Sequence, residues 1–252
     1  MLYNVPITYY VCISVGYNHS GKYFDVFETP VELKCMKGEP MKIDLRDDYR
    51  AYAIHTARAI PFAQREKVKA CLDEMKMKNI IEPVTEPTEW CHPMVVVNKS
   101  NGGVRICVDL TKLNEHIKRP VYPSKTPKEA VSNIKSGSKY FTTCDAKHGY
   151  WQIPLAEESQ KLTTFLTPWG RFKFLRAPMG LSSTGDEYCR RGEEIIENSG
   201  NIEKVMDDAI LYDESLESHL KNVRGYLDKC RENNVTLNSD KFVFAKEAVK
   251  FA

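Results

Sequence analysis

Two adjacent acids, Asp207 and Asp208, stand between two short apolar runs, and a third acid, Asp145, directly follows the apolar run 140–144. Acids at the ends of strands of one sheet can converge, but carboxylates a few ångströms apart repel one another unless a cation neutralises them. Oxygen ligands with no His or Cys nearby favour Mg²⁺ or Mn²⁺ over zinc. Two such ions about 4 Å apart can stabilise the attacking and leaving oxygens of a phosphoryl transfer. Because Asp is also common in turns, a purely structural role for the 207–208 pair is the alternative.

Hydrophobic periodicity predicts the elements that would position these acids. Asp207 and Asp208 are expected at a hairpin tip, and Asp145 at the end of a strand that becomes irregular after it. Asn-Gly-Gly at 101–103 joins two β-branched runs and predicts a second hairpin, and 168–170 marks the tip of a third. Helices are expected over 61–79, 127–134, 182–199 and 214–234. Hairpins and helices alternate without regular βαβ units, which favours an α+β fold with an antiparallel sheet.

The sequence also predicts how one of these helices begins and which face of another is apolar. Ser182 or Ser183 is expected to cap the helix over 182–199, because a serine hydroxyl can accept a hydrogen bond from a free N–H of the first turn. The helix over 214–234 is expected to present one apolar face, formed by Leu216, Leu220, Val223 and Leu227.

Composition places the 252-residue chain among globular proteins, with 42% hydrophobic and 28% charged residues. The chain contains no run of about 18 apolar residues, and its N-terminal stretch lacks the basic leader and cleavage site of a signal peptide. Neither a membrane span nor secretion is therefore expected. The eight cysteines form no CxxC pair, which argues against a structural zinc site or a disulfide scaffold.

Charge is distributed unevenly along the chain. Residues 99–176 carry 14 Lys and Arg against 6 Asp and Glu, a net charge of +8, whereas residues 177–252 carry 10 against 15, a net charge of −5. A basic segment beside an acidic one could hold a polyanion next to bound cations, although solvated helix faces would give the same counts.

Five motifs resemble, in order and spacing, the reverse transcriptase domain of gypsy-type LTR retrotransposon Pol polyproteins. They are RICVDLTKLN (105–114), FTTCDAKHGYWQIPL (141–155), LTTFLTPWGRFKFLRAPMGLSS (162–183), VMDDAILYDESLESHLKNV (205–223) and LNSDKFVFAKEAVKF (237–251). The resemblance covers about three quarters of the chain and implies the fingers and palm of a right-hand polymerase, with an antiparallel palm sheet and flanking helices. It implies an N-terminal lead over 1–60 and a reverse transcriptase domain over 61–252, with fingers 61–135 and 155–180 and palm 136–154 and 181–252.

The resemblance also assigns roles to residues that match the motifs. Asp145, Asp207 and Asp208 would be the catalytic carboxylates and would bind two Mg²⁺ or Mn²⁺ ions. Lys241 matches the lysine proposed as general acid to the leaving pyrophosphate. Tyr150 matches an aromatic that crowds the sugar 2′ position and so rejects ribonucleotides. The other implied nucleotide-binding residues are Lys99, Arg105, Asp109, Ala146 and Met179. Ordinary packing or an exposed loop position is the alternative for Tyr150, Met179 and Lys99.

The implied activity is RNA-directed DNA polymerisation, with a primed RNA or DNA template and dNTPs as partners. An intracellular protein is expected, in the cytoplasm or in a particle, associated with other Pol domains if it belongs to a longer polyprotein. Two departures stand out: Val205 replaces the aromatic of many relatives, and the chain ends before the thumb and RNase H. That ending leaves a non-catalytic, nucleic-acid- or protein-binding fragment as the alternative, and a nucleotidyl cyclase on a related palm as a weaker one.

Overall fold

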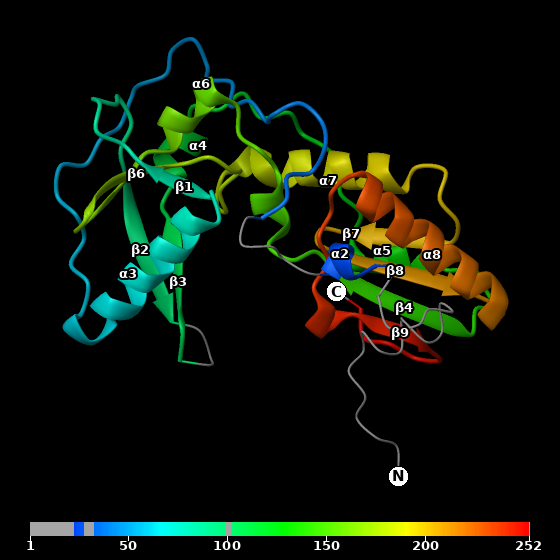
Figure 1. The fold of residues 1–252 in the computed structure, drawn as a ribbon. Coiled ribbons are helices and arrows are strands. Elements are labelled where there is room, and N and C mark those ends of the chain that lie inside the picture. The colour runs from blue at the N-terminus through cyan, green and yellow to red at the C-terminus, as the bar shows by residue number, and fades with distance from the viewer. Residues whose placement is uncertain (1–22, 28–32, 99–101, 252) are drawn as a thin grey trace. The chain divides into compact units, whose positions relative to one another are not determined.

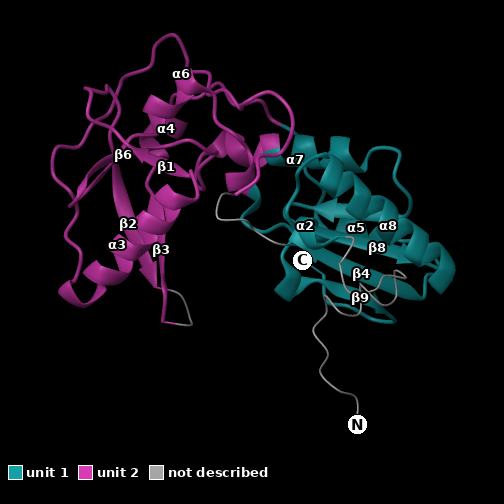
Figure 2. Ribbon diagram, viewed as in Figure 1, with its two compact units in different colours: residues 1–30, 122–149, 188–252 teal, residues 31–121, 150–187 magenta. Residues whose placement is uncertain are grey.

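A computed structural model describes residues 23–27, 33–98 and 102–251. The chain forms two compact units: unit 1 comprises 1–30, 122–149 and 188–252, and unit 2 comprises 31–121 and 150–187 (Figure 2). None of the helices among the described residues is both long and apolar enough to cross a membrane.

Unit 1 is built on a four-stranded antiparallel sheet with the strand order β7-β8-β4-β9 (Figure 1). Its strands are β4 (Tyr140–Asp145), β7 (Ile202–Val205), β8 (Asp208–Asp213) and β9 (Val243–Lys246). Helix α8 (Leu216–Glu232) packs against β8 and β4, and α5 (Pro127–Ser132) packs against β7. The sheet places apolar side chains such as Cys144, Ala209 and Leu211 in the core, and its strand β8 is buried on both faces.

Unit 2 contains a five-stranded sheet with the order β1-β6-β5-β2-β3. The strands are β1 (Ile81–Pro83), β2 (His92–Asn98), β3 (Val104–Val108), β5 (Phe165–Thr167) and β6 (Gly170–Phe174), with α3 (Phe62–Met77) against β3 and β1. All neighbours are antiparallel except β2 and β5, which run parallel. The expected antiparallel sheet is the one in unit 1, and the parallel β2–β5 pair is an addition in unit 2, where the long connection between the two strands permits a parallel arrangement.

The predicted helices and hairpins are confirmed, but two details of the helices are wrong. Ser182 and Ser183 both lie inside α7 (Ser182–Ile196), and the Ser182 N–H instead donates to Asn114 Oδ1 at 2.9 Å. A side chain from a distant segment thus accepts the hydrogen bond of a backbone N–H in the first turn of the helix. On α8, Leu216 is exposed, and the buried positions are His219, Val223, Tyr226, Leu227 and Cys230.

Part of the N-terminal lead packs into unit 1. Helix α2 (Phe24–Phe27) lies against α8, and the Val26 carbonyl accepts a hydrogen bond from Leu237 N at 2.8 Å. Arg231 of α8 donates to both carboxylate oxygens of Asp25, at 2.9 and 2.8 Å. Residues 23–27 therefore form part of the core of this unit, while the boundaries given above for lead, fingers and palm stay predictions.

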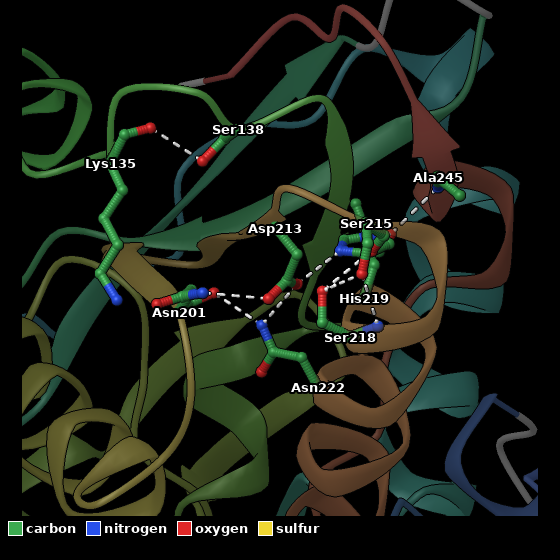
Figure 3. Close-up of polar contacts among 10 residues, drawn as sticks. Lys135, Ser138, Asn201, Asp213, Ser215, Ser218, His219, Asn222 and Ala245 are labelled. Atoms are coloured by element: carbon green, nitrogen blue, oxygen red, sulfur yellow. Dashed lines mark hydrogen bonds and ion pairs between the residues drawn. The ribbon is translucent and has the colours of Figure 1, made fainter.

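A buried polar network secures the end of β8 at Asp213 (Figure 3). The Asp213 carboxylate accepts hydrogen bonds from Asn201 (3.0 Å), Asn222 (3.0 Å) and His219 Nδ1 (2.8 Å). His219 Nε2 lies 2.7 Å from Thr142 Oγ1 on β4, and that oxygen accepts from Ala245 N on β9 at 3.1 Å. One network thus joins α8 to three strands of the sheet.

Candidate active site

The three acids of unit 1 meet at one end of its sheet. Asp145, the last residue of β4, is the register partner of Asp208, the first residue of β8. Asp207 lies in the two-residue turn between β7 and β8, and its carbonyl accepts a hydrogen bond from Ala146 N at 3.2 Å. Met206, the other turn residue, has φ = 49°, a left-handed conformation that is strained for a side chain of this size.

Lys241 reaches this carboxylate group from the segment before β9. Asn238 N donates to the Asp145 carbonyl at 2.8 Å, and Asn238 Oδ1 accepts from Asp240 N at 3.1 Å, which shapes the short helical turn η3 (Ser239–Lys241). Lys241 Nζ then lies 2.7 Å from Asp145 Oδ2. This hydrogen bond raises the pKa of Lys241 above its usual value, so it stabilises the protonated ammonium further.

Burial and mutual repulsion work against ionisation of the acids. The pKa of Asp207 is raised, first by burial and then by the charges of Asp145 and Asp208, against the lowering effect of Lys204. The pKa of Asp208 is raised by burial and by Asp145. Asp207 Oδ1 is buried and has no hydrogen-bond partner among the described residues. A cation bound to these oxygens would offset the cost of burying the carboxylates, reduce the repulsion between them and give Asp207 Oδ1 a partner.

The donor set fits a hard divalent ion, although no such ion is part of the structure. Within the described ranges, no group of three or more Asp, Glu, His or Cys side chains is already arranged to hold a metal ion. The acids nevertheless present only carboxylate oxygens, one of them an unpartnered buried atom, and these are the ligands that Mg²⁺ and Mn²⁺ prefer.

Of the other residues singled out from the sequence, Ala146 also lies at the acids: it is buried beside Asp145 and bridges to Leu237. The remaining residues lie elsewhere. Arg105 is exposed on β3, and Asp109 follows that strand, where it accepts from the Thr111 hydroxyl at 2.7 Å and contacts Arg58 at 3.4 Å. The Thr111 hydrogen bond lowers the pKa of Asp109.

Tyr150 and Met179 also belong to unit 2. Tyr150 lies in the helical turn η1 (Gly149–Gln152), and Met179 in the turn that precedes α7. Lys99 falls outside the described residues. Of the predicted residues, the structure therefore brings together Asp145, Ala146, Asp207, Asp208 and Lys241, all in unit 1.

Residues 97–252 match the family model described as "Reverse transcriptase (RNA-dependent DNA polymerase)", which is more than half of the chain. The chain belongs to the reverse transcriptase family. The retrovirus-related Pol polyprotein from transposon gypsy of Drosophila melanogaster is 31% identical over 180 residues, which cover 68% of this chain and 17% of that polyprotein. The polyprotein from transposon opus of the same organism is 27% identical over 92% of this chain, and the Tf2-3 polyprotein of Schizosaccharomyces pombe is 29% identical over 86%. This reverse transcriptase chain spans about a fifth of the length of these relatives, 16% to 23%.

Solved structures show the same fold at low sequence identity. The foamy viral protease-reverse transcriptase in complex with an RNA/DNA hybrid superposes with a TM-score of 0.83 at 16% identity, over all of this chain and 35% of the viral one. The same viral protein in complex with dsDNA gives 0.83 at 17% identity, over 54% of its chain. The fold of this reverse transcriptase family member is thus the α+β fold of polymerase fingers and palm, as expected.

Sequence reasoning missed two residues of this candidate site, Lys204 and Asn238. Lys204 is buried on β7, three residues before Asp207, and the available signal was a pair of charged residues, Glu203 and Lys204, between the apolar ends of a short strand. Asn238 anchors the segment that carries Lys241, and the available signal was the run Asn-Ser-Asp at 238–240, which is typical of a side-chain-closed turn.

Proposed function

We propose that this chain carries the catalytic centre of an RNA-directed DNA polymerase, which transfers a nucleotidyl group from a dNTP to a primer 3′-OH. The observation that supports it most directly is the pairing of Asp145 with Asp208, with Asp207 in the adjoining turn and Lys241 at 2.7 Å from Asp145. Family membership makes polymerisation the chemistry to expect from such a group.

In the proposed reaction, the primer 3′-hydroxyl releases its proton to solvent and its oxygen forms a bond to the α-phosphorus, while the bond from that phosphorus to the pyrophosphate oxygen breaks. Asp145 and Asp207, supported by Asp208, would hold two Mg²⁺ ions. Bound there, the ions supply positive charge to the attacking and leaving oxygens. Lys241, protonated and paired with Asp145, would deliver a proton to the departing pyrophosphate.

Selection of the nucleotide would fall to residues of unit 2. The exposed side chain of Arg105 forms no hydrogen bond or ion pair within the described part of the chain, so its guanidinium fork is free to bind a triphosphate. Asp109, Met179 and Lys99 would also contact the nucleotide. Ala146, which belongs to unit 1 with Asp145, would be a further nucleotide contact. The Tyr150 ring would exclude a 2′-hydroxyl.

A primed RNA or DNA template is the proposed macromolecular partner. The net charge of +8 over 99–176 suits the phosphate backbone, and binding would weaken steeply as salt rises. The foamy viral relatives were solved with an RNA/DNA hybrid and with dsDNA, which is consistent with such a partner. Other Pol domains, as in the longer relatives, would be further partners.

Primer extension on poly(rA)/oligo(dT) tests the proposal, with filter binding measured in parallel. The 252-residue chain should extend the primer only with Mg²⁺ or Mn²⁺ present, and Asp207→Asn should reduce extension by at least about a hundredfold. Asp240→Asn removes a nearby exposed acid and should leave extension unchanged. Equal extension by the wild type and Asp207→Asn would refute the proposed role of the acids. Binding without incorporation would favour the non-catalytic, nucleic-acid-binding alternative.

A further inference from the structure

Lys204 is a buried lysine next to the turn that carries Asp207 and leads into Asp208, which is called the acidic turn below. It lies on β7 with 9% of its surface exposed, and its ammonium donates a hydrogen bond to the Met206 carbonyl. The Nζ atom also lies 4.4 Å from the centroid of the Tyr188 ring. A lysine is rarely buried this deeply unless fixed partners compensate for its lost hydration, so these contacts define one position for the ammonium.

The partners of this ammonium are a carbonyl and a ring face, and neither of them neutralises its charge. Within the described ranges, Lys204 forms no ion pair with a carboxylate. Its ammonium instead lies beside Asp207, because it donates to the carbonyl of Met206, the residue directly before that acid. Burial lowers the pKa of Lys204, against the raising effect of Asp207 and Asp208. Asp207 Oδ1, buried and unpartnered, is the atom that needs such compensation most.

Helix α7 leaves a gap for the Lys204 side chain at Gly192. A Cβ atom added to Gly192 would collide with Lys204 Cε and Nζ, so only glycine leaves the side chain in its present path. Tyr188, one helical turn earlier on α7, supplies the ring face. Gly192 and Tyr188 of α7 therefore together make room for the Lys204 ammonium.

We propose that Lys204 is a fixed internal counter-cation of the acidic turn, which partly neutralises Asp207 and Asp208 when no divalent ion is bound and which a bound ion must compete against. This inference deepens the proposed function and rests on it for the class of ion. Lys204 is a positioning residue, since it touches the turn and not the reacting groups. Its charge holds the acids together in the ion-free chain.

A purely structural lysine would behave differently from a counter-cation. Lys204→Met keeps the length and apolar contacts of the side chain but removes its charge. Lys204→Arg keeps the charge, and Gly192→Ala leaves Lys204 intact but forces its ammonium aside. If the charge matters, loss of it should make the acids bind a divalent cation more tightly, because the competing positive charge is gone.

Thermal unfolding of the full chain at pH 8, across a Mn²⁺ titration, provides a readout that is independent of polymerase activity. Binding of an ion to the folded state raises Tm by an amount that increases with the logarithm of the ion concentration divided by Kd. Lys204→Met should lower Tm without ions and raise the Mn²⁺ affinity by on the order of tenfold, so its Mn²⁺-induced rise in Tm exceeds that of the wild type. Lys204→Arg should respond as the wild type does, and Gly192→Ala should fall between the two. Asp207→Asn should abolish most of the response.

The outcomes separate this inference from the proposed function. If the wild type and Lys204→Met bind Mn²⁺ equally while Asp207→Asn does not, the acids hold the ion and the counter-cation role of Lys204 is overturned. If Mn²⁺ raises Tm equally in the wild type and Asp207→Asn, the proposed ion site itself is wrong and both fail. Weaker binding by Lys204→Met than by the wild type also overturns the inference, since it would mark the lysine as a support and not a competitor.

Discussion

Asp145 on β4 lies directly opposite Asp208 on β8, at the end of a six-pair ladder that begins with Tyr140 opposite Asp213. A slip of one residue would separate the acids and turn every side chain of the strand to the other face. At the far end of the ladder, His219 contacts Asp213 (Figure 3), and its other ring nitrogen lies at hydrogen-bond distance from Thr142 of β4. The buried network at one end of the sheet therefore helps to set the register that brings the acids together at the other.

Lys241→Met should slow the nucleotidyl transfer step by about a hundredfold, the usual contribution of a general acid. Lys241→Arg should be almost as slow, because arginine keeps the charge but does not release a proton. Single-turnover incorporation of one dNTP measures this step. Lys246→Met, at an exposed position on β9, is the matched control and should keep the wild-type rate. A full rate in Lys241→Arg would show that charge alone suffices and would remove the general-acid role.

Tyr150→Ala should raise the incorporation of ribonucleotides relative to deoxyribonucleotides by on the order of a hundredfold, because an excluding ring has been removed. The ratio of kcat/KM for rTTP and dTTP, measured on one template, checks this expectation. Tyr150→Phe keeps the ring and should keep the discrimination. An unchanged ratio in Tyr150→Ala would assign the ring to packing within unit 2.

Local elements could be predicted from the sequence because their signals are local. Apolar runs around Asn-Gly-Gly gave the β2–β3 hairpin, and apolar runs around Asp207 and Asp208 gave the β7–β8 hairpin. The convergence of Asp145 with Asp208 followed from placing acids at the ends of strands. Sequence spacing does not specify which strands pair across long connections, and for that reason the parallel β2–β5 pair was not foreseen.

Contacts between distant segments account for the remaining misses. At the start of α7, the Ser182 N–H donates to the side chain of Asn114, which lies 68 residues earlier in the sequence. No pattern within the helix could have revealed this hydrogen bond. The burial of Lys204 depends on a glycine at 192 and a ring at 188, which lie on a different element. Residues 23–27 look like part of a polar lead, yet they complete the packing of α8.

Acidification should destabilise the chain through His219. Burial lowers the pKa of His219 from its usual 6.5, which outweighs the raising effect of Asp213. The folded state therefore holds the ring neutral, sandwiched between Tyr140 and Phe244, while the unfolded state takes up a proton below about pH 6.5. Because the unfolded state then binds more protons, the free energy of unfolding falls as pH drops through this range.

Urea unfolding of the wild type and His219→Gln at pH 8 and pH 5.5 measures this effect. At pH 8 the variant should be less stable by about 1–3 kcal/mol, since it leaves buried partners unpaired. It should also lose less stability on acidification than the wild type does. His55→Gln, at an exposed position, should behave as the wild type at both pH values. An equal loss in the wild type and His219→Gln would assign the acid sensitivity to other groups.

Phe27→Ala should destabilise unit 1 by about 3 kcal/mol, the usual cost of removing a buried aromatic side chain. Phe27 is 7% exposed, and its ring meets that of Phe242 edge-on, with centroids 4.9 Å apart. Phe242 directly follows Lys241, so the loss should also loosen the segment that carries Lys241 to Asp145. Phe24→Ala is the matched control on the same short helix, where the ring is 57% exposed, and it should cost less than about 0.5 kcal/mol. Equilibrium unfolding in urea gives both values, and equal values would mean that residues 23–27 are a tether and not part of the core.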